Sequence, residues 1–175
     1  MPAIDFITAL GRLLRDGAMR DALTANPQAL AAQLNLRECD RAALAQIIPA
    51  DLEFQARVLL RKRFDMVRRI VPETCRLLGA ETWPVFHAYA RTHWLTGEQS
   101  AAHDAHGFCL HLQQHQPDSL CEAELNRLRF TFSQDRFAFH FIGRKLTRNQ
   151  TKPAFQILLR FDRQRWRETM IYFRL

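Results

Sequence analysis

The stretch FAFHFI at residues 137–142 decides the fold class, because the chain there changes from a helical to a strand period. Phe137, Phe139 and Phe141 alternate with Ala138, His140 and Ile142, which is typical of a β-strand. The same alternation returns at residues 155–161 and 165–175, with a basic loop at 143–152 and a turn at 162–164 between them. We therefore predict three antiparallel strands, with apolar residues on both faces of the last two.

The residues before this stretch follow the helical period. Ile4, Ile7, Leu10 and Leu14 recur every three or four positions, and Asn26 followed by proline is a helix start signal. The patterns predict further helices at residues 38–48 (ended by a proline), 51–70, 73–78, 98–115 and after residue 119, where Ser119 and Glu122 fit a capping box. The predicted fold class is α+β: a helical domain at residues 1–96, then helices and a small three-stranded antiparallel sheet at residues 97–175.

The charge of the chain is uneven along its length. The 175 residues carry a net charge of +7, but residues 126–175 hold 12 basic and 3 acidic residues, so their net charge is +9 and the remainder is −2. This excess indicates that the strand-rich end meets an acidic partner: a peptide, a nucleic acid or a membrane surface. A solvated basic face without a partner is the alternative.

No motif nominates an active site. The chain has no nucleophile elbow, dinucleotide-binding or phosphate-binding glycine pattern. Glu122 and Glu124 read as ordinary helix surface. The four cysteines lack zinc-site or disulfide spacing and read as buried free thiols. The start of the chain lacks the features of a signal peptide, and no apolar run could span a bilayer, so we expect a cytoplasmic protein.

Five of the seven histidines lie between His93 and His115. The spacing of His111 and His115, and of His103 and His106, can place two imidazoles on one helical face, as metal sites require. Because no third ligand is indicated, surface histidines are the favoured interpretation, and we assign no metal ligands or cofactor. A stand-alone metalloenzyme remains a rival hypothesis.

The aromatic residues of the predicted sheet are the best candidate for a binding surface. An extended peptide could add a strand to the sheet edge, with aromatic pockets giving specificity and the basic loop attracting acidic residues. The same rings could stack nucleic-acid bases, so a nucleic-acid-binding regulator is the alternative function. The candidate peptide-binding residues are Phe137, Phe139, Phe141, Arg144, Lys145, Arg148 and Phe155.

A family resemblance adds to this interpretation. The segment KRFDMVRRIVPETCRLLG at residues 62–79, the earlier run from Leu13 to Leu36 and the basic three-strand ending resemble the MbnC-like partner-subunit family of methanobactin biosynthesis. The segment from His93 to His115 matches nothing in that family that we can place. The shared motifs are structural rather than catalytic.

The resemblance implies a function. Members of that family form a heteromer with a TIM-barrel oxidase that holds several iron ions. The pair uses dioxygen to convert cysteine of a ribosomally made precursor peptide to oxazolone and thioamide groups, which gives a copper chelator. The partner subunit is not an enzyme alone, supplies no iron ligands and binds the leader peptide through its C-terminal sheet. The peptide sequence, the product and the stoichiometry do not follow from this sequence.

Overall fold

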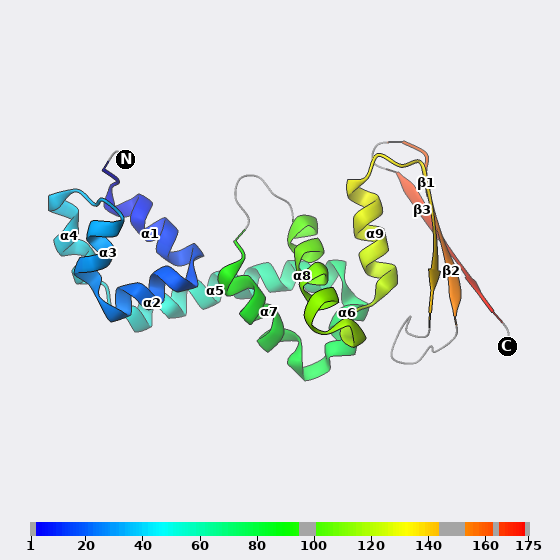
Figure 1. Cartoon of the computed structure of the whole chain (residues 1–175), viewed down its shortest axis with the longest axis horizontal. Coiled ribbons are helices and arrows are strands. Elements are labelled where there is room, and N and C mark those ends of the chain that lie inside the picture. Colours follow the sequence, from blue (N-terminus) through cyan, green and yellow to red (C-terminus); the bar gives the residue numbers. More distant parts are fainter. Residues whose placement is uncertain (1–2, 95–100, 144–152, 163–164, 174–175) are drawn as a thin grey trace. The chain divides into compact units, whose positions relative to one another are not determined.

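The computed structural model describes residues 3–94, 101–143, 153–162 and 165–173 (Figure 1). It is α+β, with helices followed by a small antiparallel sheet, as predicted. None of the helices within these residues is long and apolar enough to cross a membrane. The α-helices are α1 (Phe6–Arg15), α2 (Gly17–Ala25), α3 (Pro27–Gln33), α4 (Glu38–Ala45), α5 (Pro49–Ile70), α6 (Pro72–Leu78), α7 (Thr82–Thr92), α8 (Ala101–His115) and α9 (Glu122–Phe132).

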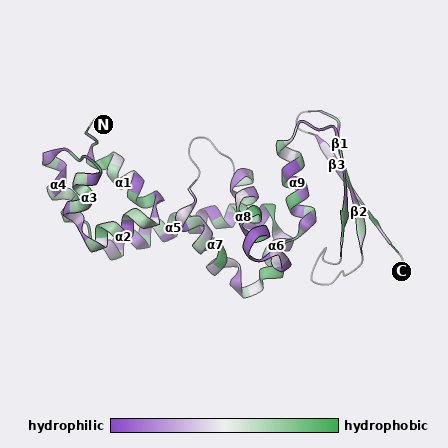
Figure 2. Cartoon of the chain, in the orientation of Figure 1, coloured by the Kyte–Doolittle hydropathy of each residue, from purple (hydrophilic) through white to green (hydrophobic). Residues whose placement is uncertain are grey.

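Two short 3-10 helices, Gly79–Glu81 and Pro117–Ser119, complete the helical part. The sheet consists of β1 (Phe137–Ile142), β2 (Ala154–Arg160) and β3 (Trp166–Tyr172) in the order β1-β2-β3, with both pairs antiparallel. Figure 2 shows hydrophobic colour along β1 and β2, whereas hydrophobic and hydrophilic residues alternate along the helices. This difference agrees with the change of period at residue 137.

The chain forms two compact units. The first comprises Met1–Arg63 and His87–Thr96, and the second comprises Phe64–Phe86 and Gly97–Leu175. The predicted boundary between residues 96 and 97 is one of the positions where the chain passes from one unit to the other. Phe64–Phe86 groups with the second unit because Phe64 packs against Trp83 and Phe86, and Phe86 packs against Phe108.

Polar side chains cap the first turns of α1, α2 and α3 in the first unit. The side chain of Asp5 accepts the backbone N–H of Thr8 at 2.8 Å, and Asp16 accepts that of Ala18 at 2.8 Å. The predicted cap Asn26 accepts the N–H of Ala29 at 3.0 Å. Each cap satisfies a backbone donor that the first turn of a helix leaves unpaired. The apolar faces of α1 to α4 then meet in one core, built around buried residues such as Leu13, Leu23, Leu30, Leu36 and Leu44.

The buried side chain of Arg20 links several elements of the first unit. The guanidinium of Arg20 is almost fully buried, donates to the carbonyl of Leu13 at 3.0 Å and forms an ion pair with Glu53 at 2.6 Å. Arg91 also pairs with Glu53, at 3.5 Å, and with Asp21. Burial of Glu53 raises its pKa, but its hydrogen bond and charge interactions with Arg20 outweigh burial, so its pKa is below the ordinary value. These ion pairs join α2, α5 and α7 within the first unit.

Two predicted helix boundaries were wrong. The helix predicted at 38–48 ends at Ala45, and Pro49 begins α5 instead of ending α4, because proline is well tolerated in the first turn of a helix. Ser119 does not cap a helix: it ends a 3-10 turn, and Cys121 precedes α9 without a side-chain cap. The helix predicted at 98–115 agrees with α8 (Ala101–His115), and its predicted first residues, 98–100, lie outside the described residues.

Candidate peptide-binding surface

The strand register sorts the side chains of the sheet into two faces. Phe137 lies opposite Leu159, and Phe141 lies opposite Phe155. Residues directly opposite each other on neighbouring strands point to the same face. We call this face of the sheet the outer face; its members are Phe137, Phe139, Phe141, Phe155, Ile157, Leu159, Arg167, Thr169 and Ile171.

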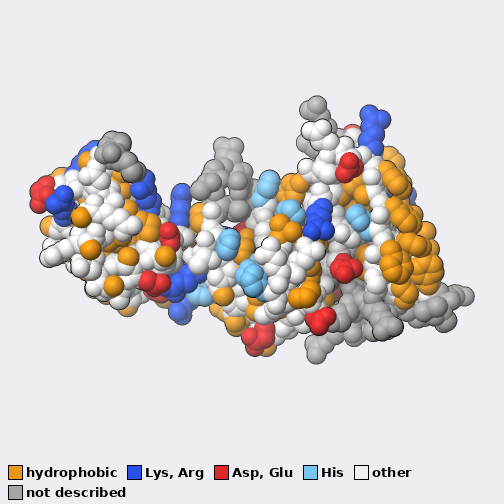
Figure 3. Space-filling view, viewed as in Figure 1, with side chains coloured by type: hydrophobic (Ala, Val, Ile, Leu, Met, Phe, Trp, Pro, Cys, Tyr) orange, Lys and Arg blue, Asp and Glu red, His pale blue; other side chains and the backbone are white. Residues whose placement is uncertain are grey.

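The outer face is apolar and open to solvent. Phe137, Phe139 and Phe141 are 58%, 50% and 60% exposed, respectively. Phe155 is half-buried between neighbouring rings: its centroid lies 4.7 Å from that of Phe139 and 5.1 Å from that of Phe173. Figure 3 shows the hydrophobic side chains that gather over the sheet. The structure thus brings together the four aromatic residues predicted to bind peptide.

The opposite face, which we call the inner face, is held against α9. Ile142, Ala154, Gln156 and Leu158 are fully buried there. The amide Nε2 of Gln156 donates to the carbonyl of Ala123 at 2.9 Å and to Oε1 of Glu168 at 2.8 Å. This buried amide joins α9, β2 and β3, so the inner face of the sheet is fixed to a helix.

A buried carboxylate fixes α9 in turn. Glu124, on α9, is 1% exposed. Its two oxygens accept the backbone N–H groups of Glu73 and Thr74, each at 2.8 Å, at the start of α6. Val71 precedes that helix and supplies no side-chain cap. The expectation that Glu124 lies on the helix surface was therefore wrong, although Glu122 is exposed. Burial raises the pKa of Glu124, and hydrogen bonds with Thr74 oppose that rise.

Both edges of the sheet carry outward backbone groups. Arg160 donates its N–H to the carbonyl of Arg136 at 2.9 Å, which makes these opposed residues a hydrogen-bonded pair. Such pairs alternate along an antiparallel ladder, so Phe137, Phe139 and Phe141 direct their N–H and C=O groups away from β2. Within the described residues, β1 pairs only with β2. The residues with the exposed rings therefore also supply the backbone groups of the β1 edge.

The two edges differ in charge. β1 has the sequence FAFHFI and carries no Lys, Arg, Asp or Glu, whereas β3 carries Arg167 and Glu168. Charged side chains on an edge strand discourage pairing with a further strand. β1 is therefore the less protected edge. The predicted basic residues Arg144, Lys145 and Arg148 lie outside the described residues.

The histidines of α8 form pairs. The rings of His111 and His115 stack with centroids 4.3 Å apart, and Nδ1 of His115 lies 2.8 Å from the carbonyl oxygen of His111. His103 and His106 both lie against the ring of Phe132, and burial lowers the pKa of His106. In the part of the chain that the structure describes, no group of three or more His, Cys, Asp or Glu residues could hold a metal ion.

All four cysteines are free thiols. Cys109 and Cys121 are buried, as predicted, whereas Cys75 is only half-buried. Cys39 is exposed on α4, so the prediction of a buried thiol was wrong there. Burial raises the pKa of Cys75 and of Cys121 to about 11. Burial also raises the pKa of Cys109. Such thiols are protonated at neutral pH and are poor nucleophiles.

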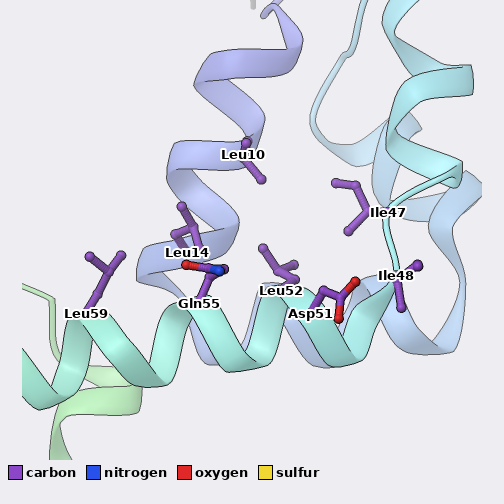
Figure 4. A pocket seen from close by; sticks show the side chains of 8 residues that line it. All are labelled: Leu10, Leu14, Ile47, Ile48, Asp51, Leu52, Gln55 and Leu59. Atoms are coloured by element: carbon purple, nitrogen blue, oxygen red, sulfur yellow. The ribbon is translucent and has the colours of Figure 1, made fainter.

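An open pocket of about 370 Å³ lies within the first unit (Figure 4). Asp51 is the only titratable residue of its lining, and the lining holds no pair of nucleophile and base. The pocket is therefore a hollow of the helical unit and does not resemble an active site. Its lining residues are Leu10, Leu14, Ile47, Ile48, Asp51, Leu52, Gln55 and Leu59.

Part of the helical region matches a known protein family. A family model described as "SCO6045-like, C-terminal domain" matches residues 46–114. The chain is similar to that family over α5 to α8, and the match ends before α9 and the sheet. No curated protein and no solved structure matches the chain.

Proposed function

We propose that this chain is a noncatalytic, cytoplasmic partner subunit of an iron-dependent TIM-barrel oxidase. It forms a heteromer with the oxidase and binds the leader of a ribosomally made precursor peptide whose cysteine is oxidised. The observation that carries the proposal is on β1, where Phe137, Phe139 and Phe141 combine exposed rings with outward backbone groups. The kind of oxidase and the chemistry of the reaction are inferred from the resemblance of residues 62–79 to the MbnC-like partner subunits.

The leader peptide binds as a fourth strand along β1. Backbone N–H and C=O groups of Phe137, Phe139 and Phe141 pair with the peptide, and alternate peptide side chains pack against their rings. Cross-strand aromatic pairs of this kind contribute about 0.2–1 kcal/mol each. The basic residues Arg144 and Lys145 attract acidic residues of the leader.

The proposal gives this chain no catalytic residue and no cofactor of its own. Iron and dioxygen chemistry belong to the oxidase, and this subunit brings the peptide to it. The product, of the oxazolone and thioamide type, is determined by the oxidase and the peptide together. The protein alone is therefore inactive toward the peptide.

Co-purification tests the heteromer. The chain is co-expressed with the TIM-barrel iron oxidase and the cysteine-containing precursor peptide encoded beside its gene. We expect a stable complex on size exclusion and in pull-down, and peptide oxidation only when both subunits are present. A neighbourhood without these genes, or separate elution of the two proteins, would refute the proposal.

A proline on β1 tests strand addition. Phe139→Pro removes the outward N–H, which makes no bond to β2, whereas Phe139→Ala removes only the ring. One intermolecular hydrogen bond is worth about 1 kcal/mol net, so we expect the leader to bind about fivefold more weakly to the proline variant than to the alanine variant. Equal affinities would exclude pairing at this edge. Circular dichroism verifies that both variants fold.

Charge reversal and a salt titration separate peptide binding from the nucleic-acid alternative. Reversal of Arg144, Lys145 and Arg148 weakens leader binding at low salt, and unchanged affinity would remove these residues from the site. A nucleic-acid-binding regulator would instead bind DNA or RNA with a steep dependence on salt concentration. Tight duplex or single-strand binding with such a slope, and no leader binding, would favour the regulator.

A further inference from the structure

We infer that the outer face of β2 and β3 is the docking surface for the oxidase subunit, and that it fits an apolar patch bordered by acidic residues. This inference rests on the proposed function. The sheet is then divided between two ligands: β1, with the rings of Phe137, Phe139 and Phe141, binds the leader, and the outer face of β2 and β3 binds the oxidase.

A strand added to β1 leaves much of the outer face open. Neighbouring strands lie about 4.8 Å apart, so a leader strand beside β1 is about 10 Å from β2 and about 14 Å from β3. Leu159 on β2 and Ile171 on β3 are 38% and 49% exposed, and a leader at that edge does not reach them. Exposed apolar side chains that lie together on one face can serve as an interaction site. The outer face of β2 and β3 is therefore available to a second ligand.

The size of the face argues against a second copy of this chain. Three strands of about six residues span roughly 14 Å by 20 Å, or about 300 Å². A stable interface takes about 800 Å² from each partner. Two copies that met only through this face would therefore separate, whereas a larger partner that also contacts the surface around the sheet would stay bound.

The charge of the face points to an acidic partner. Arg167 lies at one end of the outer face, in the same row as Phe137 and Leu159, and makes no ion pair with another described residue. Residues 126–175 carry a net charge of +9. A second copy would bring like charge against this region, whereas an acidic border on the oxidase would be attracted to it.

Two neighbouring residues of β3 provide a matched test. Ile171 lies on the outer face and Tyr172 on the inner face, and they are 49% and 47% exposed. With the oxidase and the leader encoded beside the gene as probes, we expect Ile171→Asp to weaken oxidase binding at least about tenfold. Tyr172→Asp should change it less than about twofold, since that face is turned away. Neither variant should change leader binding by more than about twofold, because both sites lie on the strand farthest from β1.

The outcomes distinguish this inference from the function on which it rests. If Phe139→Pro weakens leader binding but Ile171→Asp and Tyr172→Asp bind the oxidase as the wild type does, the docking surface is wrong and the proposed function stands. If the wild type binds neither probe, both are wrong. Self-association of the chain that Ile171→Asp abolishes would assign the face to a second copy and refute the inference. Arg167→Glu should weaken oxidase binding most at low salt; a salt-independent effect would contradict an acidic partner.

Discussion

Replacement of Glu124 tests whether its carboxylate holds α9 and α6 together. Glu124→Ala leaves the N–H groups of Glu73 and Thr74 buried without acceptors. Each unsatisfied donor costs about 1–3 kcal/mol, so we expect the free energy of unfolding to fall by about 2–5 kcal/mol. Glu124→Gln keeps one acceptor oxygen and should cost about half as much. The exposed neighbour Glu122 provides the control, and Glu122→Ala should change stability by less than about 0.5 kcal/mol.

Urea unfolding followed by circular dichroism measures these differences. With a slope of about 1–3 kcal/mol per molar urea, the loss in Glu124→Ala corresponds to a midpoint at least about 0.5 M lower than that of Glu122→Ala. Coincident midpoints for the two alanine variants would refute the cap. Loss of the cap should also loosen α9 beneath the sheet, so leader binding and stability should fall together.

The raised pKa of Glu124 gives the prediction a pH dependence. Because burial raises the folded-state pKa above the unfolded value, the folded protein binds this proton more tightly. That contribution to stability is fully present below the unfolded pKa and is lost as pH rises through the folded pKa. The stability of the wild type relative to Glu124→Gln should therefore be greater at about pH 4 than at about pH 7. If this difference in stability instead increases with pH, the hydrogen bonds lower the pKa of Glu124 by more than burial raises it.

Two further pairs of residues give matched predictions. Gly11→Ala should stabilise α1 by about 0.5–1 kcal/mol, since nothing lies within 4 Å of the added Cβ. Gly17→Ala should destabilise the protein, because the added Cβ would clash with Cγ of Arg91. Thermal melting temperatures that shift in the same direction for the two variants would contradict this prediction. A thiol reagent at neutral pH should modify exposed Cys39 within minutes and buried Cys109 only upon unfolding. Peptide mass spectrometry can follow both modifications, and equal rates would contradict the burial of Cys109.

The sequence predicted the features that depend on periodicity and local signals. The alternation at Phe137, Phe139 and Phe141 identified β1 and the face on which its rings lie, because side chains alternate across a strand whatever it packs against. Asn26 capped α3 as expected, since the cap depends on residues within one turn.

Features that depend on contacts distant in sequence could not be predicted. Glu124 reads as a surface residue of a helix, and only its packing against residues about 50 positions earlier makes it a buried cap. Gln156 is a polar residue within a predicted strand, yet its side chain is fully buried and forms a hydrogen bond with α9. In both cases a polar side chain is buried because the fold supplies its hydrogen-bond partners, which no local pattern records.

The uncharged edge of β1 has a consequence for the handling of the protein. Six consecutive residues with high strand propensity, no proline, no glycine and no Lys, Arg, Asp or Glu can also template cross-β assembly. When this edge has no ligand, copies of the chain can pair through it and precipitate. Production together with its ligands should therefore raise the soluble yield, because the segment that we propose to bind the peptide is also the one that we expect to promote aggregation of the isolated protein.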